Sequence, residues 1–399
     1  MQDVIATYYF RPADGTTPGA AAQAICEEQT TGTWTDISTR ADYVKRLDGI
    51  VDSLVPQGNG YVARIRYPAE IFEPGNMAQY VSVVAGNLFG LRRLESVRLM
   101  DVELPDALAR FRGPKFGITG VRRLIGSRDR PHVGTIIKPK VGLSPEDTAS
   151  VAYQAAIGGI DLIKDDETLT DQQFCPIDRR LPLVMKRLEE AKDETGREVL
   201  YAVNISTRAD QIIGRALHAL ELGANMLMVD VFTTGFGALQ AIGEDSRIRV
   251  PVHVHRTMHA AFTRNPEHGI AMRPWARIIR MLGADQLHTG AVGGKMSHDA
   301  PEVKASVEAL RCACYGMKPA FPVSSGGLHP GNVSHELATL GTDIILQAGG
   351  GIHGHPDGTA AGAKAMQQAV DAFMEHISVE EYAKDHYELE RALRKWGTG

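Results

Sequence analysis

Acidic and basic side chains cluster directly after one apolar run in the middle of the chain. Lys164-Asp165-Asp166-Glu167 follows Ile160-Asp161-Leu162-Ile163. Carboxylates grouped in this way suit a hard cation such as Mg2+, which usually takes one or two carboxylates together with water and substrate oxygens. On an ordinary surface the same residues would form a solvated charge run. The metal site is therefore predicted from their place at the end of a strand.

Two glycine clusters and two basic side chains indicate binding of anions. Gly326-Gly327 and Gly349-Gly350-Gly351 each follow an apolar run, and glycine lets backbone N–H groups approach a phosphate closely. Tight turns would need the same residues. Arg256 and His288 follow two other runs, and the planar guanidinium of arginine suits a second phosphate. Two anion sites beside a metal predict a small bisphosphorylated substrate.

Lys138 and Lys140 follow a further apolar run and are candidates for an acid, a base or a phosphate ligand. A lysine close to other cations and a metal can have a lowered pKa, which suits proton transfer. Lysine and metal together predict proton abstraction next to a carbonyl, with Mg2+ holding the enediolate. His253 and His259 are equally well explained as structural histidines.

All these clusters stand at the ends of apolar runs that repeat along the chain. Eight runs begin near residues 134, 160, 200, 226, 251, 284, 320 and 343, which is a spacing of about 30 residues. Apolar strands that alternate with helices predict a parallel sheet covered on both sides, and eight units fit a (β/α)8 TIM barrel. Active sites of such barrels lie at the C-terminal strand ends. An open doubly wound sheet is the alternative, but no Gly-x-Gly-x-x-Gly follows the first strand.

The first part of the chain has a different pattern. Alternating strands are expected at residues 5–10 and 61–67, and helices at 20–28 and 77–87. We therefore predict an α/β protein with two domains. Residues 1–122 would form an N-terminal α+β domain of the ferredoxin-like kind, and residues 123–399 the barrel with a C-terminal helical cap over 360–396.

Composition excludes several classes of protein. The net charge of −5 provides no basic field for nucleic acid, and no apolar run approaches the roughly 20 residues of a membrane span. The N-terminus shows no basic region followed by an apolar stretch. The chain has four cysteines, and Cys312 and Cys314 are so close in sequence that a bridge between them would be unusual. Reduced thiols in a cytoplasmic protein are expected.

Several segments together resemble the large chain of ribulose-1,5-bisphosphate carboxylase/oxygenase (RuBisCO). The segments are Gly134-Thr135-Ile136-Ile137-Lys138-Pro139-Lys140, residues 158–167, His255-Arg256-Thr257-Met258-His259, Ser325-Gly326-Gly327, Thr31-Gly32-Thr33-Trp34-Thr35 and Gly86-Asn87-Leu88-Phe89-Gly90. They occur in the family's order along nearly the whole chain. Residues 262–266 and 327–332 are most similar to the archaeal form III branch.

The resemblance implies a lyase that fixes carbon dioxide on ribulose-1,5-bisphosphate and releases 3-phosphoglycerate. Its catalytic residues would be Lys138, Lys140, Lys164, His255 and Lys295. Lys164, carbamylated by CO2, would bind Mg2+ together with Asp166 and Glu167. Substrate would be held by Glu28, Thr33, Trp34, Asn87, Arg256, His288, Ser325, Gly326, Gly327, Gly349 and Gly350. The first four would come from a neighbouring subunit, so the resemblance implies at least a homodimer with the active site between chains.

Two departures from the family pattern keep alternatives open. After Lys295 the chain continues Met296-Ser297-His298-Asp299, and both the stretch to Ser325 and the C-terminal tail are short. These features resemble form IV RuBisCO-like proteins, which enolise or isomerise methylthio-sugar phosphates or related sugar phosphates without fixing CO2. Retention of Arg256, His288 and Lys295 favours the carboxylase. A catalytically silent barrel is a third possibility, against which the Lys164, Asp166 and Glu167 set argues.

Overall fold

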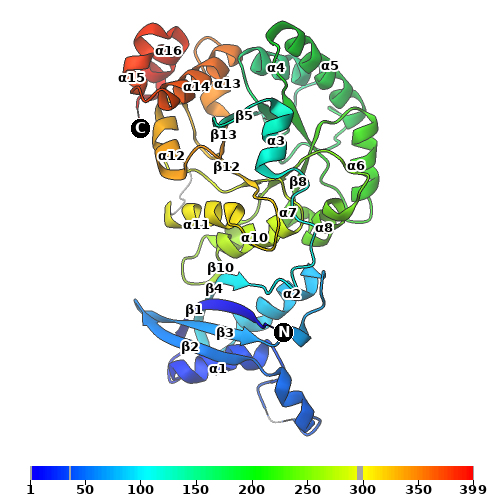
Figure 1. Cartoon of the computed structure of the whole chain (residues 1–399), viewed down its shortest axis with the longest axis vertical. Helices are drawn as coiled ribbons and strands as arrows, with labels where there is room; N and C mark the ends of the chain where they lie inside the picture. Colours follow the sequence, from blue (N-terminus) through cyan, green and yellow to red (C-terminus); the bar gives the residue numbers. More distant parts are fainter. Residues whose placement is uncertain (1, 36, 294–299, 399) are drawn as a thin grey trace. The chain divides into compact units, whose positions relative to one another are not determined.

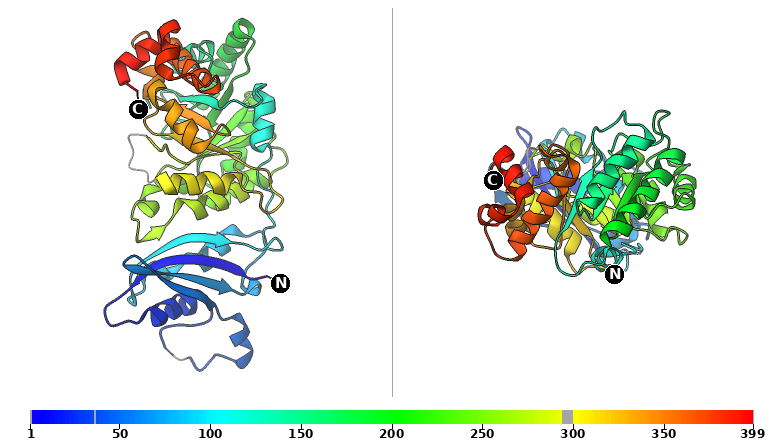
Figure 2. Two further views of the ribbon diagram at one scale, coloured as in Figure 1. Left: turned by 60° about the vertical axis from the view of Figure 1, so that its left-hand side comes forward. Right: turned by 90° about the horizontal axis from the view of Figure 1, so that it is seen from above.

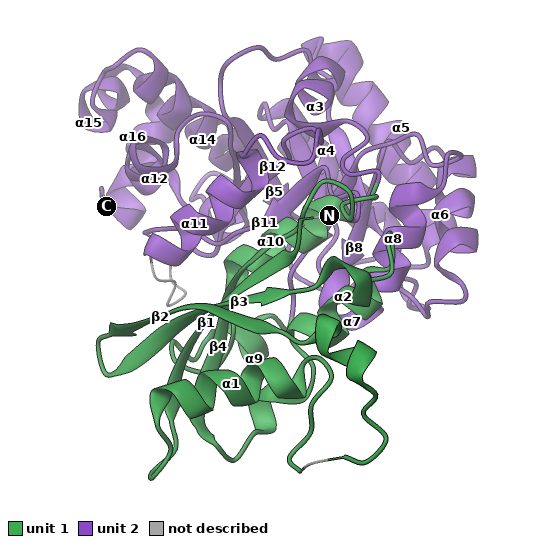
Figure 3. Ribbon diagram, turned by 60° about the horizontal axis from the view of Figure 1, so that its bottom comes forward, with its two compact units in different colours: residues 1–111, 258–281 green, residues 112–257, 282–399 purple. Residues whose placement is uncertain are grey.

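The computed structural model describes residues 2–35, 37–293 and 300–398. The chain divides into two compact units, which are coloured separately in Figure 3. Unit 1 comprises residues 1–111 and 258–281, and unit 2 comprises residues 112–257 and 282–399. The boundary between two folding domains at residues 122 and 123 stays a prediction.

Unit 2 is built on a closed barrel of parallel strands (Figure 1). Its strands are β5 (His132–Ile136), β6 (Leu162–Lys164), β7 (Leu200–Asn204), β8 (Met226–Asp230), β9 (Val252–His255), β11 (Gln286–His288), β12 (Phe321–Ser325) and β13 (Ile345–Ala348). The predicted barrel is confirmed, and because β11 pairs with β9 the sheet has closed rather than staying open. The strands read as continuous apolar runs because both of their faces are buried.

Helices lie outside the strands of unit 2 (Figure 2). They include α4 (Pro145–Ile157), α5 (Ile177–Thr195), α6 (Ile212–Glu221), α7 (Val231–Thr234), α8 (Phe236–Glu244), α11 (Ala300–Arg311), α12 (Val333–Leu340) and α13 (Gly350–His353). The predicted helical tail consists of α14 (Thr359–Met374), α15 (Val379–Tyr382) and α16 (Tyr387–Trp396). None of the helices in the described ranges is both long and apolar enough to cross a bilayer.

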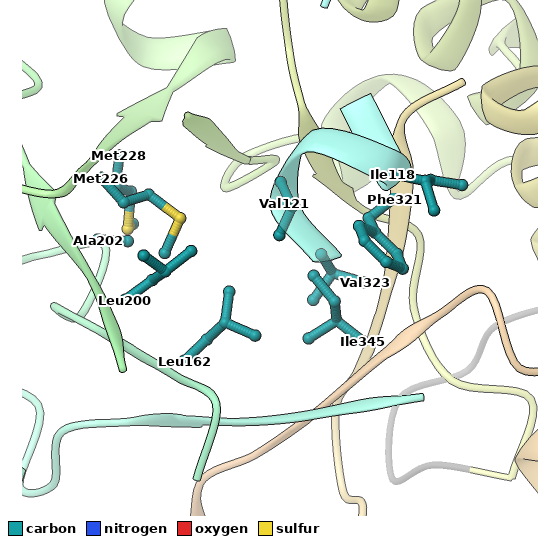
Figure 4. Close-up of a cluster of buried hydrophobic side chains, with 10 residues drawn as sticks. All are labelled: Ile118, Val121, Leu162, Leu200, Ala202, Met226, Met228, Phe321, Val323 and Ile345. Carbon is teal, nitrogen blue, oxygen red and sulfur yellow. The ribbon is translucent and has the colours of Figure 1, made fainter. Parts of the chain in front are cut away.

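One end of the barrel is filled by α3 (Gly117–Ile125). Its Ile118 and Val121 join a buried apolar cluster with side chains of β6, β7, β8, β12 and β13 (Figure 4). The strand members include the first residue of each of these strands, namely Leu162, Leu200, Met226, Phe321 and Ile345. The N-terminal strand ends therefore belong to the hydrophobic core, and the opposite ends are left for polar residues.

Unit 1 contains a five-stranded sheet in the order β10-β4-β1-β3-β2. Its strands are β1 (Val4–Pro12), β2 (Ile50–Gln57), β3 (Gly60–Tyr67), β4 (Leu94–Glu103) and β10 (Gly269–Ile270). The expected strands at 5–10 and 61–67 are β1 and β3, and the expected helices are α1 (Pro18–Glu28) and α2 (Met77–Val84). A separate short 3-10 helix, η3 (Asn87–Gly90), follows α2.

A segment between β9 and β11 completes unit 1. It contains α9 (Ala260–Thr263), β10 and α10 (Met272–Met281), and β10 pairs in parallel with β4. Buried Arg98 of β4 donates through Nη1 to the carbonyl oxygen of Thr263 at 3.0 Å. Asp101 of the same strand pairs with Arg273 at 3.0 Å and with Arg277 at 3.3 Å. These polar contacts fix the inserted segment on the edge of the sheet.

Candidate active site

Lys164 ends strand β6 with its side chain almost completely buried. Its Nζ donates to the carbonyl oxygen of Asp165 at 2.8 Å and lies 3.6 Å from Oε2 of Glu167. Burial lowers the pKa of Lys164, although the charges of Glu167 and Asp166 act in the opposite direction. A lowered pKa increases the fraction of the neutral, nucleophilic amine.

Asp166 faces the lysine that follows strand β5. Its Oδ2 accepts a hydrogen bond from Nζ of Lys138 at 2.8 Å, and its Oδ1 accepts one from Oγ1 of Thr168 at 2.9 Å. A Cβ atom on Gly349 would lie 3.2 Å from Cε of Lys138. Lys138 therefore lies between the acidic residues after β6 and the glycines after β13.

Glu167 lies within ion-pair distance of three basic side chains, which come from three strand ends. Nζ of Lys140 lies 3.3 Å from Oε1 of Glu167, and Nε2 of His255 lies 3.8 Å from Oε2. Burial alone would raise the pKa of Glu167, but His255, Lys164 and Lys140 together hold it below its usual value. Nδ1 of His255 also lies 3.4 Å from Oδ1 of Asp230, which ends β8. The carboxylate is therefore ionised and ready to bind a cation.

A buried network that the sequence analysis did not identify supports this cluster. Asp165, between Lys164 and Asp166, is fully buried. It accepts hydrogen bonds from Nη2 of Arg180 at 3.1 Å, from the hydroxyl of Tyr201 and from the backbone N–H of Asn204 at 2.9 Å. These bonds fix the backbone that carries the two flanking residues.

A second buried chain of hydrogen bonds runs through the barrel interior to Ser325. Nδ1 of His253 lies 2.7 Å from Oε1 of Gln286, and Nε2 of His253 lies 2.8 Å from Nε2 of His288. Nδ1 of His288 lies 2.7 Å from Oγ of Ser325. Burial lowers the pKa of His253 to about 3 and that of His288 well below its usual value, so both rings are neutral.

The direction of this chain follows from its first acceptor. Because Oε1 of Gln286 can only accept, Nδ1 of His253 carries the proton and its Nε2 accepts from Nε2–H of His288. Nδ1 of His288 then accepts, so the hydroxyl of Ser325 donates to it. The remaining hydrogen-bonding capacity of Ser325 Oγ is that of an acceptor. His253 is thus more than a satisfied core residue, while His259 is bonded to Thr263 within unit 1 at 2.9 Å.

The remaining anion-binding candidates of unit 2 lie at neighbouring strand ends. Arg256 follows β9 and is 6% exposed, and burial lowers its pKa to about 10 while Glu302 acts to raise it. Gly326 and Gly327 follow β12 with φ of +109° and +106°, a conformation that side chains other than glycine rarely adopt. Gly350 begins the short helix α13.

Five other candidates are placed differently. Glu28 ends α1 and Asn87 begins η3. The residue after Glu28, Gln29, donates through Nε2 to the carbonyl oxygen of Val83 in α2, the helix that precedes η3. Thr33 is exposed, and Trp34 is 88% exposed. These four candidates belong to unit 1. Lys295, together with the segment 296–299, lies outside the described residues.

This arrangement can perform proton transfer beside a bound cation. It combines a buried amine with a lowered pKa, the two carboxylates of Asp166 and Glu167, and two further lysines within ion-pair distance of them. The histidine chain then leads from this cluster to Ser325, because the rings of His255 and His288 are 4.6 Å apart. The residues of β5, β6, β8, β9, β11 and β12 therefore form one polar site.

Comparison with known families gives two matches that together cover nearly the whole chain. Residues 1–108 match the family model described as ribulose bisphosphate carboxylase large chain, N-terminal domain. Residues 117–396 match the model described as the catalytic domain of the same large chain.

Individual relatives agree with this result. A curated protein named ribulose bisphosphate carboxylase from Pyrococcus abyssi is 42% identical over 99% of this chain and 93% of its own length. The protein of the same name from Methanosarcina acetivorans is 42% identical over 99% of this chain and 96% of its own. Both organisms are archaea, as the resemblance in the sequence predicted.

Solved structures extend the agreement to three dimensions. The octameric Rubisco from Pyrococcus horikoshii OT3, in complex with sulfate ion, superimposes with a TM-score of 0.95 at 41% identity, covering 99% of this chain and 94% of that one. The dimeric archaeal Rubisco from Hyperthermus butylicus gives a TM-score of 0.92 at 39% identity, covering 100% and 96%.

Proposed function

This chain belongs to the ribulose bisphosphate carboxylase large-chain family, and on that premise we propose that it is a Mg2+-dependent ribulose-1,5-bisphosphate carboxylase. It enolises the bisphosphate, adds CO2 and cleaves the product to 3-phosphoglycerate. The observation that carries the proposal is the cluster of ion pairs at the C-terminal strand ends. Lys138 pairs with Asp166, and both Lys164 and His255 lie within ion-pair distance of Glu167.

The residues after β6 fit a magnesium ion. Asp166 and Glu167 offer carboxylate oxygens, the donor type that Mg2+ prefers, and Lys164 becomes an oxygen donor once its amine has reacted with CO2. The reaction converts Lys–NH2 and CO2 into a carbamate anion and releases one proton. We assign these three residues as the metal ligands. When bound, Mg2+ supplies Lewis-acid stabilisation of the negative charge that develops on substrate oxygens.

We assign proton transfer during enolisation to Lys138, whose Nζ is held by Asp166 at 2.8 Å. A side chain held in one position by a carboxylate loses less entropy when a proton passes between it and the substrate. Lys140 and His255 assist near the reacting carbons, since both face Glu167. Lys295 we assign to orienting CO2, on the strength of the family motif alone.

Two anion sites would hold the ends of the bisphosphate. Arg256 and His288 form one of them: the buried guanidinium of Arg256 pairs with the phosphate. His288 contributes by holding Ser325, since both of its ring nitrogens are already bonded. The backbone at Gly326, Gly327, Gly349 and Gly350 forms the other. Between them, Ser325 accepts a hydrogen bond from a substrate hydroxyl, because its own proton is given to His288.

We further propose that the working enzyme is a homodimer or a larger homo-oligomer. The related structures from Hyperthermus butylicus and Pyrococcus horikoshii are described as dimeric and octameric. Glu28, Thr33, Trp34 and Asn87 then complete the site of a neighbouring subunit, and a tryptophan that is 88% exposed in one chain gains a partner surface. Four thiols fit a reducing cytoplasm, where we propose that the enzyme works.

The decisive test supplies ribulose-1,5-bisphosphate, Mg2+ and labelled bicarbonate and measures labelled 3-phosphoglycerate. We expect labelled product from the native chain and none from Lys164→Ala. Absence of label, with exchange of the substrate C3 proton retained, would replace the carboxylase by a RuBisCO-like enolase or isomerase. Absence of both the labelled product and the proton exchange would favour the third possibility, a catalytically silent barrel. Lys186→Ala, on the outer face of α5, is the matched control and should retain activity.

A further inference from the structure

Two cysteines directly beyond α11 have their sulfur atoms in contact. Sγ of Cys312 and Sγ of Cys314 are 2.9 Å apart, which lies between a non-bonded contact and a disulfide bond of about 2.05 Å. We propose that Cys312 and Cys314 form a reversible dithiol–disulfide site that reacts with low-molecular-weight disulfides of the glutathione class. The site lies outside the catalytic cluster and does not depend on the proposed carboxylase activity.

The backbone on the helical side of the pair is fixed. Arg311, the last residue of α11, donates to the carbonyl oxygen of Leu340 at 2.6 Å and to that of Asp343. The backbone N–H of Cys312 donates to the carbonyl oxygen of Glu308 at 2.8 Å and continues the helical pattern. Cys312 is therefore held at a helix end that is itself tied to the next strand–helix unit.

The backbone on the other side of the pair forms a tight turn. The N–H of Met317 donates to the carbonyl oxygen of Cys314 at 3.1 Å, and the two residues between them have positive φ, 58° at Tyr315 and 62° at Gly316. These values are typical of a type I′ turn, which reverses the chain. The fold therefore places both sulfur atoms together before any bond forms, and closing the bridge requires little rearrangement.

Of the four cysteines, only Cys312 and Cys314 can meet a solvent-borne reagent. Cys26 and Cys175 are 1% and 0% exposed, whereas Cys312 and Cys314 are half-buried. Cys312 also lines an open groove of about 680 Å³ together with Lys304, Glu308 and Arg311. The groove carries two cations, Lys304 and Arg311, against one anion, Glu308, and this balance attracts a disulfide that carries carboxylates, such as glutathione disulfide.

The chemistry follows thiol–disulfide exchange and balances without another reagent. The thiolate of Cys312 attacks one sulfur of the small disulfide, forms a mixed disulfide and expels one thiolate. The thiolate of Cys314 then attacks the Cys312 sulfur, which releases the second small thiol. The chain loses two protons and two electrons, and the small disulfide gains them to become two thiols.

The bridge is expected to be easily reversed. The loop that it closes contains a single residue between the two cysteines, so it constrains the unfolded chain very little and adds little stability. Strained or exposed disulfides have higher reduction potentials than structural ones and are the labile kind. The oxidised fraction should therefore follow the ratio of disulfide to thiol in the surroundings.

The test uses the reduced full chain in buffers of graded glutathione disulfide to glutathione ratio. After acid quenching and alkylation of remaining thiols, mass spectrometry of the intact chain and of its peptides measures the product. We expect a monomeric species that has lost two hydrogen atoms, with the bridge located in the peptide that contains residues 312–314. Return to glutathione-rich buffer should restore both thiols.

Two single variants separate the steps. Cys314→Ser should stop at the mixed disulfide on Cys312, and Cys312→Ser should form a mixed disulfide more slowly at Cys314. Cys26→Ser leaves the pair intact and should oxidise like the native chain. The proposal is overturned if the native chain accumulates mixed disulfides without an internal bridge, if the bridge joins two chains, or if the thiols stay unmodified at every ratio.

Discussion

Replacing Gln286 by leucine should lower kcat/KM for the sugar bisphosphate without disturbing the metal site. Gln286 is buried, and its Oε1 is the acceptor that sets the direction of the chain through His253 and His288 to Ser325. Leucine has nearly the same size and offers no acceptor. Nδ1–H of His253 is then left without its partner, and the two rings become free to adopt the opposite tautomers.

The size of the effect follows from the lost bond. A buried donor without its acceptor costs about 1–3 kcal/mol. The rings relieve this cost by moving the proton of His253 to Nε2, which makes His288 donate toward Ser325 and reverses the chain. The hydroxyl of Ser325 then accepts from His288 and its own proton is freed, which changes its hydrogen bond with the substrate hydroxyl. Loss of one such buried hydrogen bond, about 1–3 kcal/mol, corresponds to about 5- to 150-fold in kcat/KM.

The assay compares substrate saturation of Gln286→Leu with that of the native chain at saturating CO2 and Mg2+. We expect kcat/KM for ribulose-1,5-bisphosphate to fall within that range while the concentrations of CO2 and Mg2+ needed for activation stay unchanged. Gln347→Leu is the matched control, since Gln347 is an equally buried barrel glutamine whose Nε2 donates to the carbonyl oxygen of Thr135 at 2.6 Å. Equal losses of kcat/KM in both variants would refute a specific role of the chain.

Three further predictions concern other parts of the barrel. Tyr201→Phe removes a donor to buried Asp165, which should cost about 1.5–3 kcal/mol and lower the unfolding temperature in calorimetry, and an unchanged temperature would contradict the network. Burial lowers the pKa of His132 to about 4, so the folded state loses stability as the pH falls below about 6.5. The free energy of unfolding in urea should therefore differ between pH 7 and pH 5, and His132→Gln should reduce that difference by about 2 kcal/mol. Gly327 has φ of +106°, so Gly327→Ala should destabilise the fold by about 1–3 kcal/mol and also raise the substrate KM. Gly223 has φ of +95° and open space around it, so the control Gly223→Ala should change stability alone.

The sequence was sufficient to predict the barrel because its strands are short continuous apolar runs with polar residues at one end. The same local signal located Lys164, Asp166 and Glu167 at a strand end. Strands β2, β4 and β10 of unit 1 carried no such signal. Strand β4 includes Arg98, a charged residue that is buried only because carbonyl groups of the inserted segment, including that of Thr263, satisfy it.

The supporting residues of the site were hidden for a related reason. His253 and Gln286 are neighbours only because β9 and β11 pair in the register that sets them side by side. Arg180 and Tyr201 reach Asp165 from a helix and a neighbouring strand. Each contact depends on how strands and helices pack against one another, so no spacing along the chain reveals it. Polar residues within or next to the predicted strands are the sequence signal that would have identified these supporting residues as candidates.

Under the proposed function, the charges of the site link the reaction of buried Lys164 with CO2 to the binding of the metal. In the structure the lysines Lys138, Lys140 and Lys164 face the carboxylates of Asp166 and Glu167, so the cluster is close to neutral once Lys164 loses its proton. Carbamate formation then adds one negative charge beside two carboxylates. Close, poorly solvated anions repel strongly, so the carbamate is stable only when a divalent cation joins it. Under the proposed function, activation by CO2 and binding of Mg2+ are therefore expected to be two halves of one equilibrium, in which each raises the affinity for the other by the same factor.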